Sequence, residues 1–177
     1  MINLPKQVYL DWQEQLTNNS VFRNWWQFWS NYSFIFYAFA GVWLLFDESF
    51  WVISVLSTAS FIFARVFLTP LINLVYKKKR PYQKYEFSPI TSRFFSWKTS
   101  EPNSFPSRHA IALTTVAVAI SVFSPIIGYG LLLVSIISGI GRVVLGYHWP
   151  ADIIGGVVLG VIVGYVVTVV GLLSFFT

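Results

Sequence analysis

Two histidines are the only imidazole groups in this 177-residue chain, and each lies in a short polar stretch of an otherwise apolar sequence. His109 belongs to the stretch 105–110, and His148 belongs to the stretch 142–152. A third stretch, 77–81, is strongly basic. Phosphoryl transfer by covalent catalysis requires an imidazole nucleophile, a second imidazole that serves as an acid, and cations that bind the phosphate oxygens. The three stretches together contain all of these groups, so they predict that chemistry.

The stretch around His109 has the features of a helix start. Pro106 is well suited to a first-turn position, because its missing N–H would be unpaired there in any case. The unpaired backbone N–H groups of such a start bind anions, and Arg108 would lie beside them. A structural alternative is that Ser104 or Ser107 only caps the helix, but a cap does not account for the adjacent arginine and histidine. Ser107 and Arg108 are therefore candidate phosphate-binding residues.

His148 and Asp152 are four residues apart, and Trp149-Pro150 should start a helix between them, since the residue before a proline is pushed out of the helical region. The Asp152 carboxylate would then reach one ring nitrogen and leave the other to attack. The alternative is a first-turn aspartate that interacts only with the helix dipole. Asp152 is, however, the one acidic residue after Glu101, and a charge at a membrane boundary is costly unless it has a function.

The cations near these residues are less specific signals. Arg142 precedes His148 by six positions, and we expect it at the same phosphate site, although it could instead extend toward lipid headgroups. For the basic run 77–80, phosphate binding and attraction to anionic lipids are equally good interpretations. Arg65 lies inside a predicted membrane span and could reach the same polar face, but we leave it outside the site.

The composition indicates a single membrane domain. Hydrophobic residues make up 55% of the chain and charged residues 11%, whereas soluble domains contain about 25% charged residues. The net charge of +5 does not indicate nucleic-acid binding, because most lysines and arginines are concentrated between 77 and 108. The sequence contains no cysteine, so it offers neither a disulfide nor a thiolate metal ligand.

We predict an all-α fold, a polytopic membrane helix bundle with about five transmembrane helices and an N-terminal interfacial helix. Residues 1–30 would form an amphipathic segment at the membrane interface, and residues 31–177 would form the membrane domain with an active-site loop at 77–104. The first predicted span has an aromatic lead-in at 25–29. The spans are 25–46, 50–76, 106–123, 126–145 and 150–173.

Each hairpin returns the chain to the opposite face of the membrane. The ends of the second and fourth spans and the starts of the third and fifth should therefore meet on one side, and these ends carry the candidate residues. Gly156, Gly160 and Gly164 recur at four-residue intervals in the last span, a pattern that lets helices approach closely. We expect packing within the chain there, with a dimer interface as the alternative.

Three blocks of the sequence resemble the signature of the type 2 phosphatidic acid phosphatase superfamily. They are Arg80-Pro81, then Pro106-Ser107-Arg108-His109, and then Arg142 followed by His148 and Asp152. Both the order and the spacing agree, and the flanking spans fit the membrane members of that superfamily.

The resemblance implies a role for each residue. His148 would be the nucleophile that forms a phosphohistidine, with Asp152 orienting it. His109 would protonate the leaving group and then activate water as a base. The groups that hold the phosphate oxygens would be Arg80, Ser107, Arg142 and the backbone at Arg108. The superfamily needs no metal or other cofactor, and the sequence has no His/carboxylate cluster with ligand spacing.

The chain departs from the usual signature at three positions. The first block has a lysine seven residues before its arginine, where this chain has Asn73; Lys77, one helical turn further on, would supply the cation instead. Arg108 stands where glycine is usual, and its guanidinium would contact a second phosphate, which favours a diphosphate substrate. Gly141 stands where serine is usual, which removes one possible hydroxyl contact.

The sequence therefore predicts a metal-independent integral membrane phosphatase for a lipid phosphate or diphosphate. Undecaprenyl diphosphate, phosphatidylglycerophosphate and phosphatidic acid are the candidate substrates, and neither the choice among them nor the oligomeric state follows from the sequence. The alternative is a small membrane transporter or an anionic-lipid-binding protein. A transporter would carry its charges near the bilayer midplane, whereas the charges of this chain cluster at helix ends. Vanadium haloperoxidases share the phosphate-site residues but are larger soluble proteins.

Two arguments about the membrane face of the site disagree. The lysines and arginines between 77 and 98 place the site in the cytoplasm by the positive-inside rule. The resemblance to bacterial lipid phosphatases that recycle carriers implies an extracytoplasmic site in the cell membrane. Because part of that positive charge belongs to the phosphate site, we favour the extracytoplasmic face, with the C-terminus in the cytoplasm.

Overall fold

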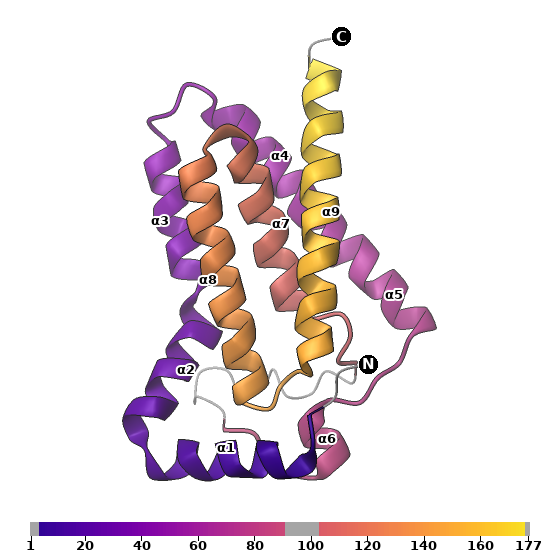
Figure 1. Ribbon diagram of the computed structural model, residues 1–177. Coiled ribbons are helices and arrows are strands. Elements are labelled where there is room, and N and C mark those ends of the chain that lie inside the picture. The colour runs from indigo at the N-terminus through magenta and orange to yellow at the C-terminus, as the bar shows by residue number, and fades with distance from the viewer. Residues whose placement is uncertain (1–3, 91–102, 176–177) are drawn as a thin grey trace.

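The computed structural model describes residues 4–90 and 103–175, and within them the regular structure is entirely helical. This confirms the predicted all-α class. The elements, shown in Figure 1, are α1 (Lys6–Asn18), α2 (Ser20–Tyr32), α3 (Phe34–Leu44), α4 (Phe50–Ile62), the π-helix η1 (Phe63–Leu68), α5 (Thr69–Val75), α6 (Pro81–Tyr85), α7 (Arg108–Phe123), α8 (Pro125–Val144) and α9 (Pro150–Phe175). The predicted loop 77–104 contains the short helix α6, and much of the rest of it lies outside the described residues.

The centre of the bundle is α7, with α4, α8 and α9 packed around it. Its contact with α9 is especially close, because glycines remove the side chains there. A Cβ atom at Gly156, Gly160 or Gly164 would lie 3.0, 2.9 or 2.6 Å from a backbone carbonyl oxygen at the start of α7 or within it. This confirms that the glycine stripe serves packing within the chain.

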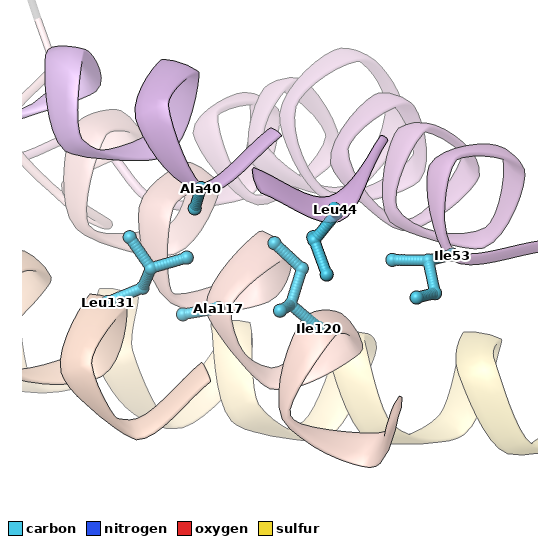
Figure 2. Packing of buried hydrophobic residues seen from close by; sticks show 6 residues of the cluster. All are labelled: Ala40, Leu44, Ile53, Ala117, Ile120 and Leu131. Atoms are coloured by element: carbon cyan, nitrogen blue, oxygen red, sulfur yellow. The ribbon is translucent and has the colours of Figure 1, made fainter. Parts of the chain in front are cut away.

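A buried apolar cluster joins four helices near the turns that connect α3 to α4 and α7 to α8. Figure 2 shows its six residues, which are Ala40, Leu44, Ile53, Ala117, Ile120 and Leu131. Removing apolar area from water stabilises a fold by about 25 cal/mol per Å². This end of the bundle is therefore held by apolar packing, while the polar residues gather at the other end.

Three helices are long and apolar enough to cross a membrane, with bounds Phe50–Val75, Pro125–Val144 and Pro150–Ser174. Two shorter apolar helices, α3 and α7, have 11 and 16 residues. Large apolar side chains such as Trp43 and Ile126 are exposed on the outer surface, as expected where lipid is the solvent. The membrane bundle is thus confirmed, and the count of about five spans stays a prediction.

The first two predicted spans are less regular than expected. The first is not one helix, because Ser33 separates α2 from α3. The second runs without interruption over Phe50–Val75 but contains η1. Pro70 gives a reason for the π-helix, since proline has no N–H and crowds the carbonyl four residues before it. The N–H and the hydroxyl of Thr69 both donate to the carbonyl of Ala64, the hydroxyl at 2.8 Å.

The N-terminal segment contains two helices rather than one. Asn19 separates them and caps α2, because its side chain accepts a hydrogen bond from the N–H of Phe22 at 3.0 Å. α1 crosses the lower end of the bundle in Figure 1. Its Tyr9 and Leu16 are fully buried, and both pack against residues of the loop between α8 and α9. The predicted location of residues 1–30 at a membrane interface stays a prediction.

Candidate active site

The polar residues singled out from the sequence lie at one end of the bundle, the lower end in Figure 1. The starts of α7 and α9 and the end of α8 meet there, as the alternation of spans predicts. Two backbone hydrogen bonds join these segments. The N–H of Ser107 donates to the carbonyl of Asp152 at 3.1 Å, and the N–H of Ser104 donates to the carbonyl of Lys78 at 2.8 Å. The main chain itself therefore holds together residues that are far apart in sequence.

His148 lies in the tight turn between α8 and α9 and is only 3% exposed. Gly146 takes a φ of 80°, a conformation that glycine adopts without strain. The N–H groups of Tyr147 and His148 both donate to the carbonyl of Arg142, at 2.9 and 3.2 Å. Tyr9 of α1 closes the turn from outside, since its hydroxyl donates to the carbonyl of His148 at 3.4 Å. The position of the imidazole is thus fixed by its own backbone.

Opposite charges face the two ring nitrogens of His148. Nη1 of Arg80 lies 3.2 Å from Nε2, and Oδ2 of Asp152 lies 3.6 Å from Nδ1, slightly beyond hydrogen-bond length. A guanidinium only donates, so Nε2 is the accepting nitrogen and Nδ1 carries the proton that faces the carboxylate. Burial lowers the pKa of His148 from 6.5 to about 4, although the neighbouring Asp152 raises it. The imidazole is therefore neutral at pH 7 with a lone pair on Nε2, as a nucleophile requires.

Asp152 is fully buried, and each of its carboxylate oxygens has partners. Oδ1 forms an ion pair with Nζ of Lys78 at 2.7 Å. Oδ2 accepts hydrogen bonds from the N–H of Trp149 at 2.9 Å and from the hydroxyl of Ser104. The bond to Trp149 is typical of an acidic residue in the first turn of a helix. Asp152 therefore stabilises the start of its own helix, which is the structural alternative, and also lies next to His148.

Two buried arginines flank the turn, Arg80 at 6% and Arg142 at 7% exposure. Arg80 donates to the carbonyl of Tyr147 at 3.1 Å and to that of Asn103 at 3.2 Å. Arg142 donates through Nη2 to the carbonyl of Ser30 at 3.0 Å, and its Nε has no hydrogen-bond partner among the described residues. Such burial does not fit a side chain that extends to lipid headgroups. Both guanidinium groups lower the pKa of the imidazole, and Nη1 of Arg80 lies next to its Nε2.

The other candidate residues differ in position. Lys77 is exposed. Arg108, the first residue of α7, is partly exposed. Ser107 caps α7, because its hydroxyl accepts a hydrogen bond from the N–H of Ala110 at 3.4 Å. The contribution of these three residues to phosphate binding stays a prediction.

Sequence reasoning missed the importance of Lys78 within the basic run. Tyr76 and Arg80 both have extended backbone angles, and no helix is formed between them. Residues two apart in an extended chain point to the same side, and here Lys78 reaches Asp152 while Arg80 reaches His148. Pro81 was the available signal, because a residue before proline favours the extended conformation.

His109 has a different set of neighbours. Its Nε2 lies 3.1 Å from the hydroxyl of Ser33, at the junction of α2 and α3. That hydroxyl lies 3.2 Å from Oγ of Ser138 in α8. Neither serine was singled out from the sequence, because Ser33 was expected in the middle of a continuous span.

An apolar groove of about 470 Å³ lies beside the turn that carries His148. Its walls come from α8, α9 and α1 and from Leu4, two residues before α1. The lining residues are Leu4, Trp12, Ile136, Ile140, Val143, Val144, Pro150, Ile153, Ile154, Val157 and Val158. Pro150 and Ile153 lie in the first turn of α9, directly after the turn that carries His148, so an apolar chain in this groove would have its polar end near that histidine.

The arrangement contains the groups needed for phosphoryl transfer: a buried imidazole with a guanidinium at one ring nitrogen and a carboxylate near the other, a second buried arginine at the end of α8, and a second imidazole at the start of α7. Among residues 4–90 and 103–175, no group of three or more His, Asp or Glu side chains is arranged to hold a metal ion.

Comparisons with known proteins agree with this chemistry. The sequence profile of the PAP2 superfamily matches residues 54–174, which include every candidate site residue. Undecaprenyl-diphosphatase BcrC of Bacillus subtilis (strain 168) is 27% identical over 95 residues, which are 54% of this chain and 46% of that protein. Bacitracin transport permease protein BcrC of Bacillus licheniformis is 31% identical over 81 residues, which are 46% of this chain and 39% of that protein. The aligned regions thus span less than half of either relative. No solved structure gives a significant match.

Proposed function

Because this chain belongs to the PAP2 superfamily, with a match over residues 54–174, we propose that it is an integral membrane phosphatase for a lipid phosphate or diphosphate. The observation that carries the proposal is the buried imidazole of His148, whose Nε2 lies 3.2 Å from Nη1 of Arg80 and whose Nδ1 lies 3.6 Å from Oδ2 of Asp152. This is a nucleophile beside anion-binding groups, and a phosphate ester is a substrate on which both can act.

The reaction has two steps. In the first, Nε2 of His148 attacks phosphorus, a P–N bond forms, and the P–O bond to the leaving group breaks while His109 donates a proton to the departing oxygen. Arg80 and Arg142 balance the charge on the phosphoryl oxygens. In the second, His109 takes a proton from water, the water oxygen attacks phosphorus, the P–N bond breaks, and inorganic phosphate leaves. Asp152 keeps the imidazole in one tautomer and balances the positive charge that develops on it.

Undecaprenyl diphosphate is the substrate that we favour. The relative from Bacillus subtilis is named for that substrate, the apolar groove beside the catalytic turn suits a hydrocarbon chain, and Arg108 offers a cation for a second phosphate. Phosphatidylglycerophosphate and phosphatidic acid carry the same kind of headgroup and are the alternatives.

Phosphate release in detergent tests this proposal on a panel of undecaprenyl diphosphate, phosphatidylglycerophosphate and phosphatidic acid. We expect release from at least one of these lipids by the wild-type protein and none by His148→Ala. Equal release by the variant would show that His148 is not the nucleophile. Release should also persist in EDTA and be inhibited by vanadate, which adopts the five-coordinate geometry of phosphoryl transfer; loss on chelation with recovery on adding a divalent ion would contradict the metal-independent mechanism.

A transporter is the second candidate, because the relative from Bacillus licheniformis is named a transport permease. The buried charges of this chain lie at helix ends next to a nucleophile, which favours the enzyme. A folded wild-type protein that releases phosphate from no lipid on the panel would favour the transporter.

We further propose that the site faces the extracytoplasmic side of the cell membrane and that the C-terminus is cytoplasmic. C-terminal fusions test this topology, since green fluorescent protein fluoresces when the tail is cytoplasmic and alkaline phosphatase is active only when exported. An active phosphatase fusion with a dark fluorescent fusion would reverse the assignment.

A further inference from the structure

The hydroxyl of Ser33 is directed across the bundle at the second imidazole. Ser33 is fully buried where α2 meets α3. A serine before a helix commonly caps it, but Ser33 makes no cap hydrogen bond to α3. Its hydroxyl instead lies 3.1 Å from Nε2 of His109 and 3.2 Å from Oγ of Ser138. The family match begins at residue 54, so family membership does not supply this contact.

α2 also contacts α8 next to the pair formed by Ser33 and Ser138. Ser138 and Arg142 are one turn apart on α8; Ser138 meets Ser33, and Arg142 donates to the carbonyl of Ser30 at 3.0 Å. Gly141 permits this approach, because a Cβ atom there would lie 3.2 Å from a backbone carbonyl oxygen of α2. The glycine that departs from the usual third block therefore makes room for the helix that leads to Ser33.

A hydroxyl suits a histidine that acts first as an acid and then as a base. It accepts a hydrogen bond from a protonated ring nitrogen and donates one to an unprotonated nitrogen. Because Ser33 contacts Nε2 of His109, Nδ1 is the nitrogen that exchanges a proton with the leaving group and with water. Nε2 then keeps its proton in both states and donates it to Oγ of Ser33, which can in turn donate to Oγ of Ser138. A carboxylate only accepts, and in its place would favour the protonated imidazole.

We propose that Ser33 is a positioning residue for His109. It orients the imidazole for proton transfer to the leaving group and, through Ser138, is itself held in place by α8. The acid–base half of the site is thus completed by a segment outside the family match. This inference rests on the proposed function, because orientation of His109 matters only if a leaving group must be protonated.

The test compares two leaving groups in the variant Ser33→Ala. Dioctanoyl phosphatidic acid releases an alkoxide that needs a proton, whereas p-nitrophenyl phosphate releases a phenolate that needs little help. The measured quantity is kcat/KM, which includes departure of the leaving group and not the later attack of water. We expect kcat/KM to fall roughly tenfold on phosphatidic acid, a fraction of what a general acid contributes, and to change less than about twofold on p-nitrophenyl phosphate. Ser33→Thr keeps the hydroxyl and should restore most of the loss.

A double variant separates positioning from folding. If Ser33 acts through the imidazole, Ser33→Ala should cause no further loss in a His109→Ala background. Ser121→Ala is the matched control, because among the described residues that hydroxyl bonds only to the carbonyl of Val118 within α7. This variant should leave kcat/KM unchanged on both substrates. Ser138→Ala should show a smaller loss with the same leaving-group dependence, which keeps the test usable if Ser33→Ala does not fold.

Equal losses on the two substrates, or additive losses in the double variant, would show that Ser33 supports only the fold and would overturn the inference. A folded wild-type protein that hydrolyses neither of these substrates nor any other lipid of the panel is a different result. It would refute the proposed function, and the inference would fail with it.

Discussion

The two histidines of this protein are held in contrasting ways. His148 lies in a loop, has a guanidinium at one ring nitrogen and a carboxylate near the other, and is neutral because burial lowers its pKa to about 4. His109 lies in a helix and contacts the neutral hydroxyl of Ser33. Charged partners fix one tautomer and one protonation state, which suits a nucleophile. An uncharged hydroxyl accepts a hydrogen bond from Nε2 without favouring the protonated imidazole, which suits an acid that later acts as a base.

The largest effect should come from removing the imidazoles one at a time. His148→Ala should abolish turnover of every substrate, because no covalent intermediate forms without the nucleophile. His109→Ala should reduce kcat/KM on phosphatidic acid by roughly 10²–10⁴-fold, the range of general acid catalysis, and much less on p-nitrophenyl phosphate. Steady-state kinetics on both substrates measures the difference. A similar dependence on the leaving group in both variants would show that the roles are wrongly assigned.

The next effect concerns the carboxylate beside His148. Asp152→Asn should lower kcat by roughly 10²–10⁴-fold on both substrates, because asparagine no longer fixes the tautomer of His148 and no longer forms the ion pair with Lys78. The loss should not depend on the leaving group, which distinguishes it from the loss at His109. Asp11→Asn is the control, since Asp11 is exposed on α1. An Asp152→Asn enzyme with normal kcat on p-nitrophenyl phosphate would contradict the orienting role.

The pH profile should show the depressed pKa of His148. On the acid side, kcat/KM should stay high from pH 6.5 down to about 4 and fall below that, because protonation of Nε2 removes the attacking lone pair. The native pKa lies below the unfolded value of 6.5, so the unfolded chain binds a proton that the native protein excludes. Because of this difference at His148, the free energy of unfolding should decrease as the pH falls from 6.5 toward 4. Titration of its ring protons by NMR gives the value directly, and a midpoint near 6.5 would contradict a buried neutral nucleophile.

The smallest effect should follow from Gly141→Ser, which introduces the residue usual in the third block. The new Cβ atom would lie 3.2 Å from a backbone oxygen of α2, so α2 should move by a few tenths of an ångström. Since a 1 Å misplacement can cost about a hundredfold, we expect a loss of about threefold on phosphatidic acid and little change on p-nitrophenyl phosphate. Gly130→Ser is the matched control, because no atom lies within 4 Å of a Cβ there. A gain in activity would show that a hydroxyl contact outweighs the helix approach.

The same contrast explains how much could be predicted from the sequence. Among the charged residues around His148, Arg142 and Asp152 lie close to it in sequence and Arg80 lies in the basic run. Charges in an apolar chain are conspicuous. The alternation of spans then predicted that the starts of α7 and α9 meet, as they do. The contact of Ser33 with His109 joins residues 76 positions apart, and a serine in an apolar segment carries no comparable signal. Tyr9 was missed for a related reason, because an aromatic residue near the N-terminus fits a membrane interface as well as a buried contact.

The glycine contacts between α7 and α9 give the site a mechanical link to the interior of the bundle. Gly164 is twelve residues beyond Asp152, about 18 Å along the helix at 1.5 Å per residue. The backbone bond from Ser107 to Asp152 ties the two helices together at the site end. A larger side chain at Gly164 would push the two helices apart there and would therefore rotate α9 about that bond. The carboxylate of Asp152 lies at the axis of this rotation, so a change of packing at Gly164 would alter its orientation toward His148.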